Sequence, residues 1–161
     1  MNQAHFHLLI THLPIFGSIL GGLVLGYGLW SKSHQTKIAA YNLLIISSIG
    51  AVIAYLTGEA AEERVEKIQG ISKDLISQHE DFAVIALVGL IILGVTSIIG
   101  LLLILKKSTF SRSVATITLM LSLISFGLIA RTGYLGGQIR HSEMNSSTTN
   151  PAPGGEEQDD D

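Results

Sequence analysis

The amino-acid sequence predicts an all-α integral membrane protein, a four-helix bundle whose second and third helices extend outside the membrane. The chain has 161 residues, of which 47% are hydrophobic and 14% are charged, whereas a soluble domain carries roughly 25% charged residues. The mean hydropathy is +0.46. The apolar residues are concentrated in four long runs that contain no permanent charge, and about 20 such residues in a helix cross a ~30 Å hydrocarbon core.

The four expected spans lie at about 8–30, 38–57, 82–105 and 114–135, within a bundle that covers residues 1–141. The first span is expected to be retained, because no basic segment precedes it and its apolar run is too long for a signal peptide.

The segments beside these spans are polar. Residues 58–81 show apolar positions at helical spacing, which predicts that the second and third helices continue outside the membrane. Gly70 is expected to make the turn between them, and Ser72 to cap the third helix. The tail 142–161 is polar and acidic and contains proline and glycine, and it is expected to be disordered.

The distribution of charge predicts the orientation of the chain. The loops 31–37 and 106–113 contain basic residues and no acid, whereas all 13 acidic residues lie on the other side of the expected spans. Loops rich in lysine and arginine stay in the cytoplasm. We therefore expect a multi-pass protein of a bacterial inner membrane, with both termini on the periplasmic side. Membrane lipid is the expected surrounding, and no nucleic-acid partner is expected.

Histidines gather at the predicted outer ends of the helices. Five of the six histidines lie there, and they come from three helices: His5, His7, His12, His79 and His141. His34 lies in a predicted cytoplasmic loop and is expected to be solvated. Inward-facing ionisable groups at membrane depth are costly and usually functional, and two imidazoles on facing helices can bind a haem iron axially. The chain has no cysteine, which excludes covalent c-type haem attachment and makes haem b the most economical cofactor.

The expected axial ligands of the haem iron are His12 and His79. His79 shares an apolar stripe with Phe82 and Ala86, so it is expected to point into the bundle. His12 is also expected to face inward. His7 lies about 140° around the helix from His12 and is a further candidate, although one pocket would not easily use both.

Two other features of the first helix are left open by the sequence. His5 would share a face with His12 if the helix begins that early, and it is expected to lie at the surface. Pro14 would either kink a helix that extends back to His5 or mark the start of a helix near His12. The pairs Gly17/Gly21 and Gly22/Gly26 are typical of close helix packing.

The end of the fourth span offers further cofactor-binding candidates. Gly133, Gly137 and His141 follow one another at a spacing of four, which places a histidine beside a glycine groove suited to a planar macrocycle. Arg131 and Arg140 lie at the same end and are candidate partners of haem propionates.

Two motifs give the chain a family resemblance. HLLITHLPI (7–15) resembles the opening H-P-x-L-V-H-F-P-I of a bacterial family of four-span membrane proteins catalogued as a domain of unknown function, and TGYLGGQIRH (132–141) resembles its closing T-G-x-L-G-G segment. TGEA (57–60) and His79 fit the same layout. This resemblance implies a b-type cytochrome with ligands at His7, His12 and His79, and approximately at His141. The chain departs from the family pattern at Leu8, where the family has proline, and at Tyr134, where the family often has histidine.

Three functions remain open at this point. The first is a membrane b-type cytochrome that takes electrons from a quinol or a partner subunit and passes them to a periplasmic cytochrome c or another subunit of a membrane complex. Such a protein is expected to act as an electron-transfer subunit in preference to a stand-alone enzyme. The second is a periplasm-facing protein that handles copper or zinc. The third is a structural subunit of a larger membrane complex.

Overall fold

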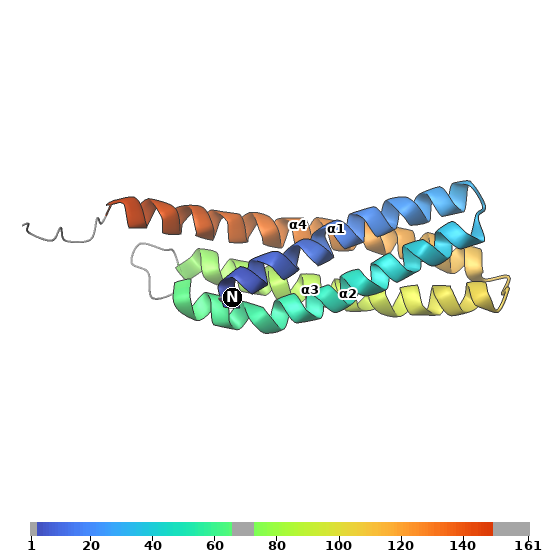
Figure 1. Ribbon diagram of the computed structural model, residues 1–161, viewed down its shortest axis with the longest axis horizontal. Helices are drawn as coiled ribbons and strands as arrows, with labels where there is room; N and C mark the ends of the chain where they lie inside the picture. Colours follow the sequence, from blue (N-terminus) through green and yellow to red (C-terminus); the bar gives the residue numbers. More distant parts are fainter. Residues whose placement is uncertain (1–2, 66–72, 150–161) are drawn as a thin grey trace, which may run out of the picture.

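A computed structural model describes residues 3–65 and 73–149. Four helices make up this part of the chain: α1 Gln3–Trp30, α2 His34–Val65, α3 Lys73–Leu105 and α4 Ser111–Thr149. They run alternately up and down along one elongated bundle, and no strand occurs among the described residues (Figure 1). The predicted all-α four-helix architecture is therefore confirmed.

The helices form a ring in which each one packs against the next. α1 contacts α2 and α4, and α3 contacts α2 and α4, whereas the diagonal pairs α1/α3 and α2/α4 scarcely touch. α1 and α3 begin at the same end of the bundle, where α2 and α4 finish (Figure 1). This end contains His7 and His79 and is called the histidine end. The opposite end contains the turns 31–33 and 106–110 and is called the basic end.

The outer surface of the bundle is apolar. All four helices are long and apolar enough to cross a membrane, with mean hydropathies from 1.9 to 2.8 over their spans Phe6–Trp30, His34–Gly58, Lys73–Leu105 and Ser111–Ile139. Large apolar side chains point outward from every helix, among them Leu23, Ile49, Val95 and Ile124. Small polar side chains lie inside instead, among them Ser18, Ser47, Ser97 and Ser122. This arrangement is typical of helices packed in lipid, and the chain is a multi-pass membrane protein.

The glycine pairs of α1 hold two neighbouring helices close. A methyl group added at Gly17 would lie 2.7 Å from Ser47 Cβ, and one at Gly21 would lie 2.6 Å from Leu44 Cδ2, so this pair faces α2. Gly22 contacts Ser122 of α4 in the same way. The glycine pairs of α1 therefore serve helix packing, as their spacing predicts.

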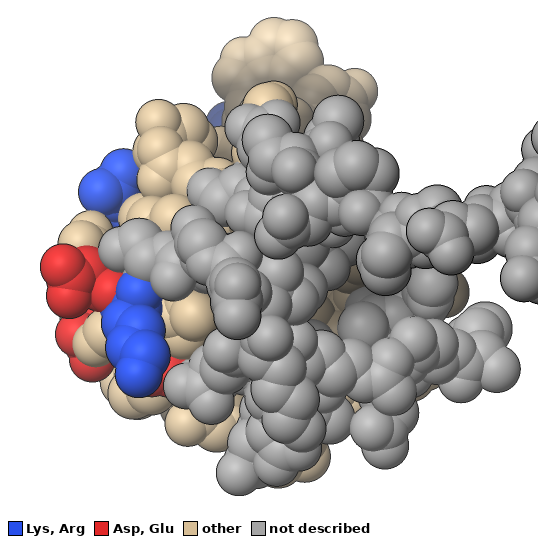
Figure 2. Space-filling view, turned by 90° about the vertical axis from the view of Figure 1, so that its left-hand side faces the viewer, with Lys and Arg blue, Asp and Glu red and all other residues tan. Residues whose placement is uncertain are grey.

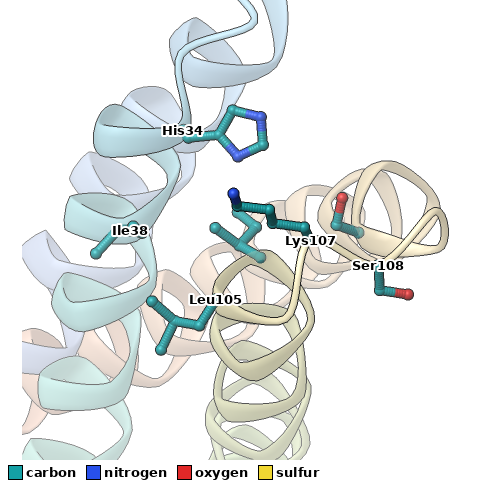
Figure 3. Close-up of a pocket in the computed structure, with 7 residues that line it drawn as sticks. His34, Ile38, Leu105, Lys107 and Ser108 are labelled. Atoms are coloured by element: carbon teal, nitrogen blue, oxygen red, sulfur yellow. The ribbon is translucent and has the colours of Figure 1, made fainter.

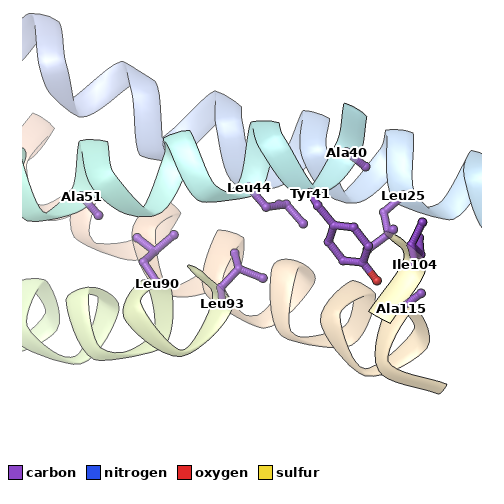
Figure 4. Packing of buried hydrophobic residues seen from close by; sticks show 9 residues of the cluster. All are labelled: Leu25, Ala40, Tyr41, Leu44, Ala51, Leu90, Leu93, Ile104 and Ala115. Carbon is purple, nitrogen blue, oxygen red and sulfur yellow. The ribbon is translucent and has the colours of Figure 1, made fainter. Parts of the chain in front are cut away.

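The apolar core lies between the middle of the bundle and the basic end. Figure 4 shows nine buried residues that all four helices contribute: Leu25, Ala40, Tyr41, Leu44, Ala51, Leu90, Leu93, Ile104 and Ala115. Tyr41 is the largest fully buried side chain, and its ring packs directly against Gly100. Its hydroxyl is the one buried side-chain polar atom of the described residues that has no hydrogen-bond partner.

α2 and α3 extend beyond their expected spans, as predicted, whereas α4 is longer than predicted. α2 reaches Val65 and α3 begins at Lys73, so both extend past the expected spans, while Gly70 and Ser72 lie outside the described residues. α4 continues to Thr149, so the expectation that the whole tail 142–161 is disordered is wrong for residues 142–149. The segment between Ile139 and Thr149 contains no glycine or proline that would stop the helix. Residues 150–161 lie outside the described part.

Candidate functional site

His7 lies inside the bundle, where α1 packs against α2. Its Nδ1 donates a hydrogen bond to the carbonyl of Ala54 at 2.9 Å, with the Thr57 hydroxyl 3.2 Å away. The ring also lies against Gly58, where an added methyl group would be 3.4 Å from Cε1 of His7. A carbonyl oxygen only accepts, so the proton of this neutral imidazole is on Nδ1 and the lone pair is on Nε2.

His79 makes the corresponding contacts between α3 and α4. Its Nδ1 donates to the carbonyl of Thr132 at 3.0 Å, and its ring lies against Gly136, where an added methyl group would be 3.2 Å from Cε1. The same reasoning places the Nδ1 proton on this bond and leaves the Nε2 lone pair free. The inward orientation expected from the apolar stripe of α3 is present.

The two histidines make the same two contacts with their neighbouring helices. In each case the imidazole donates to the carbonyl of a residue on the neighbouring helix, and its ring packs on the glycine four residues later in that helix: Ala54 and Gly58 for His7, Thr132 and Gly136 for His79. Residues four apart lie one above the other on a helix face. The glycine has no side chain, so the ring can approach the helix backbone.

The pair spans the diagonal of the bundle. α1 and α3 lie diagonally opposite each other, and His7 and His79 lie near the start of these two helices, at the same end of the bundle. Among the residues whose side chains the structure describes (6–58, 73–139 and 141), none forms a hydrogen bond with either Nε2. Since Nδ1–H bonded to a backbone carbonyl is the usual orientation of a metal-binding histidine, the geometry offers two imidazole ligands from opposite helices.

Each histidine lies on a packing seam, which is a row of residues seven apart on the face of its helix that packs inside the bundle. In α1, His7, Pro14, Gly21 and Gly28 all contact α2. In α3, His79, Ala86, Leu93 and Gly100 all lie on the packed side of the helix. A spacing of seven returns to nearly the same face of a helix. Each histidine therefore occupies the outermost position of a seam that the helix uses for packing.

Pro14 is an interior residue of α1, because the helix begins at Gln3. The interpretation of Pro14 as a helix start is therefore excluded. Its side chain is buried and its carbonyl accepts a hydrogen bond from the Ser47 hydroxyl at 3.2 Å. Proline has no N–H, so the carbonyl of Ile10 loses its usual helical donor.

The expectation that His12 faces inward is wrong. Its side chain is exposed, its Nδ1 donates to the carbonyl of Leu8 in its own helix at 2.7 Å, and its ring stacks on Phe16 with centroids 6.1 Å apart. The physical reason is the angle of about 140° between positions 7 and 12. When His7 faces α2, His12 must face away from the bundle.

Most of the remaining predicted residues lie around the pair without contacting it. Gly133, Gly137 and His141 are exposed on α4. An added methyl group at Gly137 would contact nothing within 4 Å, and one at Gly133 would meet only Ile15 Cδ1 at 3.8 Å. The predicted glycine groove beside His141 is therefore open on the bundle surface. His5 and Arg140 have side chains outside the described part, and His34 lies at the basic end.

Arg131 is held at the rim of the site by aromatic rings. Its guanidinium lies over the ring of Phe82 at 5.6 Å and over that of Tyr134 at 5.5 Å. It directly precedes Thr132, the residue that binds His79. Figure 2 looks onto this end and shows acidic and basic side chains next to each other on its described part. The exposed charges that α3 contributes there are Lys73, Asp74, Glu80 and Asp81.

Sequence reasoning missed four residues of the site. Ala54 and Thr132 provide the carbonyls, and Gly58 and Gly136 provide the flat contact for the rings. Both pairs consist of a small residue followed by glycine four positions later. Neither is a glycine pair, so the spacing of glycines alone does not indicate them.

The pair itself supplies two imidazole donors. No group of three or more histidine, cysteine, aspartate or glutamate side chains is gathered in the described part of the chain. Zinc sites use three or four protein ligands, whereas a haem iron takes two axial ligands from the protein. No family model, curated protein or solved structure matches this chain.

Proposed function

We propose that the protein is a membrane b-type cytochrome in which His7 and His79 bind the iron of haem b through Nε2. The observation that carries the proposal is the matched binding of the two rings. Each Nδ1 donates to a backbone carbonyl, at 2.9 Å for His7 and 3.0 Å for His79. Such a bond fixes the tautomer and the ring orientation and increases the basicity of the other nitrogen.

The residues present fit this cofactor. Two imidazoles come from diagonally opposite helices, as in other bundles that build cofactor sites from facing helices. Gly58 and Gly136 keep side chains away from the rings. Arg131, at the rim, is the proposed partner of a propionate, and Arg140 is a second candidate. A bis-histidine haem supplies one-electron transfer and leaves no open iron position for oxygen or peroxide chemistry.

The position of the pair supports a role near one membrane surface. His7 binds α2 next to the exposed Tyr55, and His79 binds α4 next to the exposed Tyr134. Tyrosine is enriched where a helix meets the membrane surface. Since the opposite end carries basic loops without acids, we place the pair on the periplasmic side of a bacterial inner membrane.

The proposed role is electron transfer between a membrane donor and a periplasmic acceptor. The donor is a quinol or a partner subunit, and the acceptor is a periplasmic cytochrome c or another subunit. Acidic groups at the histidine end, such as Glu80 and Asp81, favour docking of basic partners. The resemblance of HLLITHLPI (7–15) and TGYLGGQIRH (132–141) to a cytochrome-like family supports the same role.

An absorption spectrum tests the proposal. The full chain, produced in cells supplied with haem and purified in mild detergent, is expected to show b-type bands that sharpen when the sample is reduced. A preparation that stays colourless after reconstitution with haem would overturn the proposal. Metal analysis of that colourless sample would then test the copper or zinc alternative.

Substitution of the two glycines is expected to have unequal effects. Gly136→Ala adds a methyl group 3.2 Å from His79 Cε1, so the ring must shift by a few tenths of an ångström, whereas Gly58→Ala adds one at an ordinary 3.4 Å from His7. Loss of the orientation of a metal ligand weakens metal affinity by about tenfold or more. Haem titration of the apoprotein should therefore show weaker binding for Gly136→Ala and near-normal binding for Gly58→Ala. Equal affinities for the two variants would contradict this contact geometry.

A further inference from the structure

A cavity lies at the basic end, far from the histidine pair. It has a volume of about 490 Å³ and lies between the first turn of α2 and the turn that joins α3 to α4. Figure 3 shows that the His34 imidazole and the Lys107 amine occupy the same side of this cavity. The volume is within the range of small-molecule sites, roughly 300–1,000 Å³.

The lining of the cavity is divided into an apolar part and a polar part. The apolar part consists of Ile38, Ile104 and Leu105. The polar part consists of His34, Lys107, Ser108 and Ser111. A ligand that fits both parts must itself be amphipathic.

The cavity lies where the membrane spans end. Leu105 is the last residue of one candidate span, and His34 and Ser111 are the first residues of two others. Trp30 and Phe110 are 79% and 69% exposed at the same end, and exposed aromatic rings are typical of the membrane–water interface. The apolar part of the cavity therefore faces the hydrocarbon side and the polar part the headgroup side.

The electrostatic environment favours an anion. Neither the first turn of α2 nor that of α4 contains an acidic residue, so the partial positive charges of these two helix starts are not neutralised locally. The loops 31–37 and 106–113 contain five basic residues and no acid. Lys107 adds a full positive charge to the cavity itself.

The backbone of Lys107 adopts a left-handed conformation at the end of α3. Its φ is 53°, in the left-handed region, and it occupies the position after α3 where glycine is usual. The Lys107 N–H donates to the Ile104 carbonyl at 3.0 Å and the Ser108 N–H donates to the Leu103 carbonyl at 2.9 Å, which is the Schellman pattern. A lysine in this position costs conformational energy that a glycine would not. Lys32 has the same conformation, with a φ of 54°, after α1, so a left-handed lysine follows both helices that end at the basic end.

We propose that this cavity binds an anionic phospholipid, with the headgroup phosphate at Lys107 and His34 and an acyl chain along Ile38, Ile104 and Leu105. Amphipathic shape, depth and charge all favour a lipid as the occupant. Basic pockets between membrane helices bind anionic headgroups in this way. The inference is independent of the proposed haem function, because the cavity and the histidine pair are at opposite ends of the bundle (Figure 1).

Native mass spectrometry of the full chain tests the proposal. The protein is mixed in detergent with equal amounts of phosphatidylglycerol and phosphatidylcholine. The wild type is expected to retain phosphatidylglycerol preferentially, and Lys107→Gly is expected to bind it about fivefold more weakly, since one lysine near an anionic surface contributes on that order. Glycine suits the φ of 53°, so the lipid-free thermal midpoint of Lys107→Gly should stay close to that of the wild type. Lys107→Asn serves as a second variant because asparagine also tolerates this conformation.

Lys106→Ala is the matched control. Lys106 precedes Lys107 and carries the same charge, but it does not line the cavity, so its substitution should weaken retention less. Three results would overturn the proposal: equal retention of the two lipids, equal losses in the Lys106 and Lys107 variants, or undiminished retention in Lys107→Gly. Displacement of the lipid by inorganic phosphate at the same concentration would identify free phosphate, and not lipid, as the ligand.

Discussion

His7→Ala and His79→Ala are each expected to abolish the b-type absorption bands, whereas His12→Ala should retain them. His7 and His79 each donate through Nδ1 to a carbonyl of a neighbouring helix, which leaves Nε2 as the nitrogen that can bind a metal. His12 is exposed and bonds within its own helix. Removal of either inward imidazole takes away one of two axial ligands, so bound haem per protein should fall by at least about tenfold. The measurement is the haem-to-protein ratio of variants purified in parallel.

His12→Ala is a stringent control because the sequence alone favours His12 as a ligand. It lies on the same helix as His7, only five positions away, and its removal leaves the packing seam of α1 intact. Loss of the bands in His12→Ala together with their retention in His7→Ala would show that α1 binds haem through its outer face. Circular dichroism of each variant shows whether the helices still form.

Gly100→Ala is expected to cause the largest loss of stability among the glycine substitutions. A methyl group at this position would overlap the Tyr41 ring and hydroxyl, and Tyr41 is 0% exposed. Figure 4 shows its side chain among the residues of the core. Overpacking of this kind costs about 1–3 kcal/mol, which should lower the midpoint of thermal unfolding in detergent.

Gly127→Ala provides the matched control for this substitution. Gly127 is exposed on α4, and an added methyl group would contact nothing within 4 Å. Its midpoint should stay unchanged or rise slightly, because alanine has a higher helix propensity than glycine. A fall in the midpoint of Gly127→Ala as large as that of Gly100→Ala would mean that glycine itself, and not the contact with Tyr41, determines the result.

The fold could be predicted from local information. Each span of α1 to α4 is a long apolar run, and hydrophobicity over about 20 residues is enough to identify a membrane helix. The length of α4 could not be predicted in this way, because polar residues 142–149 resemble a disordered tail in composition while containing no residue that stops a helix. The composition of a segment indicates whether it can lie in lipid, but it does not determine where its helix ends.

The gathering of histidines at one end was likewise predictable from span lengths and loop charges. His79 was correctly expected to face inward, because α3 has a clear apolar stripe around it. α1 has no such apolar stripe. It is apolar nearly all round, so a pattern of polar and apolar residues does not show which side packs against protein and which against lipid.

The sequence by itself determined the four membrane helices, the end at which the histidines lie and the relative angle between His7 and His12. Only the tertiary structure decided which of the two points inward. Helical geometry sets the angle of about 140° between them, but the absolute rotation of α1 depends on its partner. Gly21 and Pro14 pack against α2, and they turn the face they share with His7 towards Ala54. Close packing at small residues on α1 therefore selects the histidine that the bundle encloses.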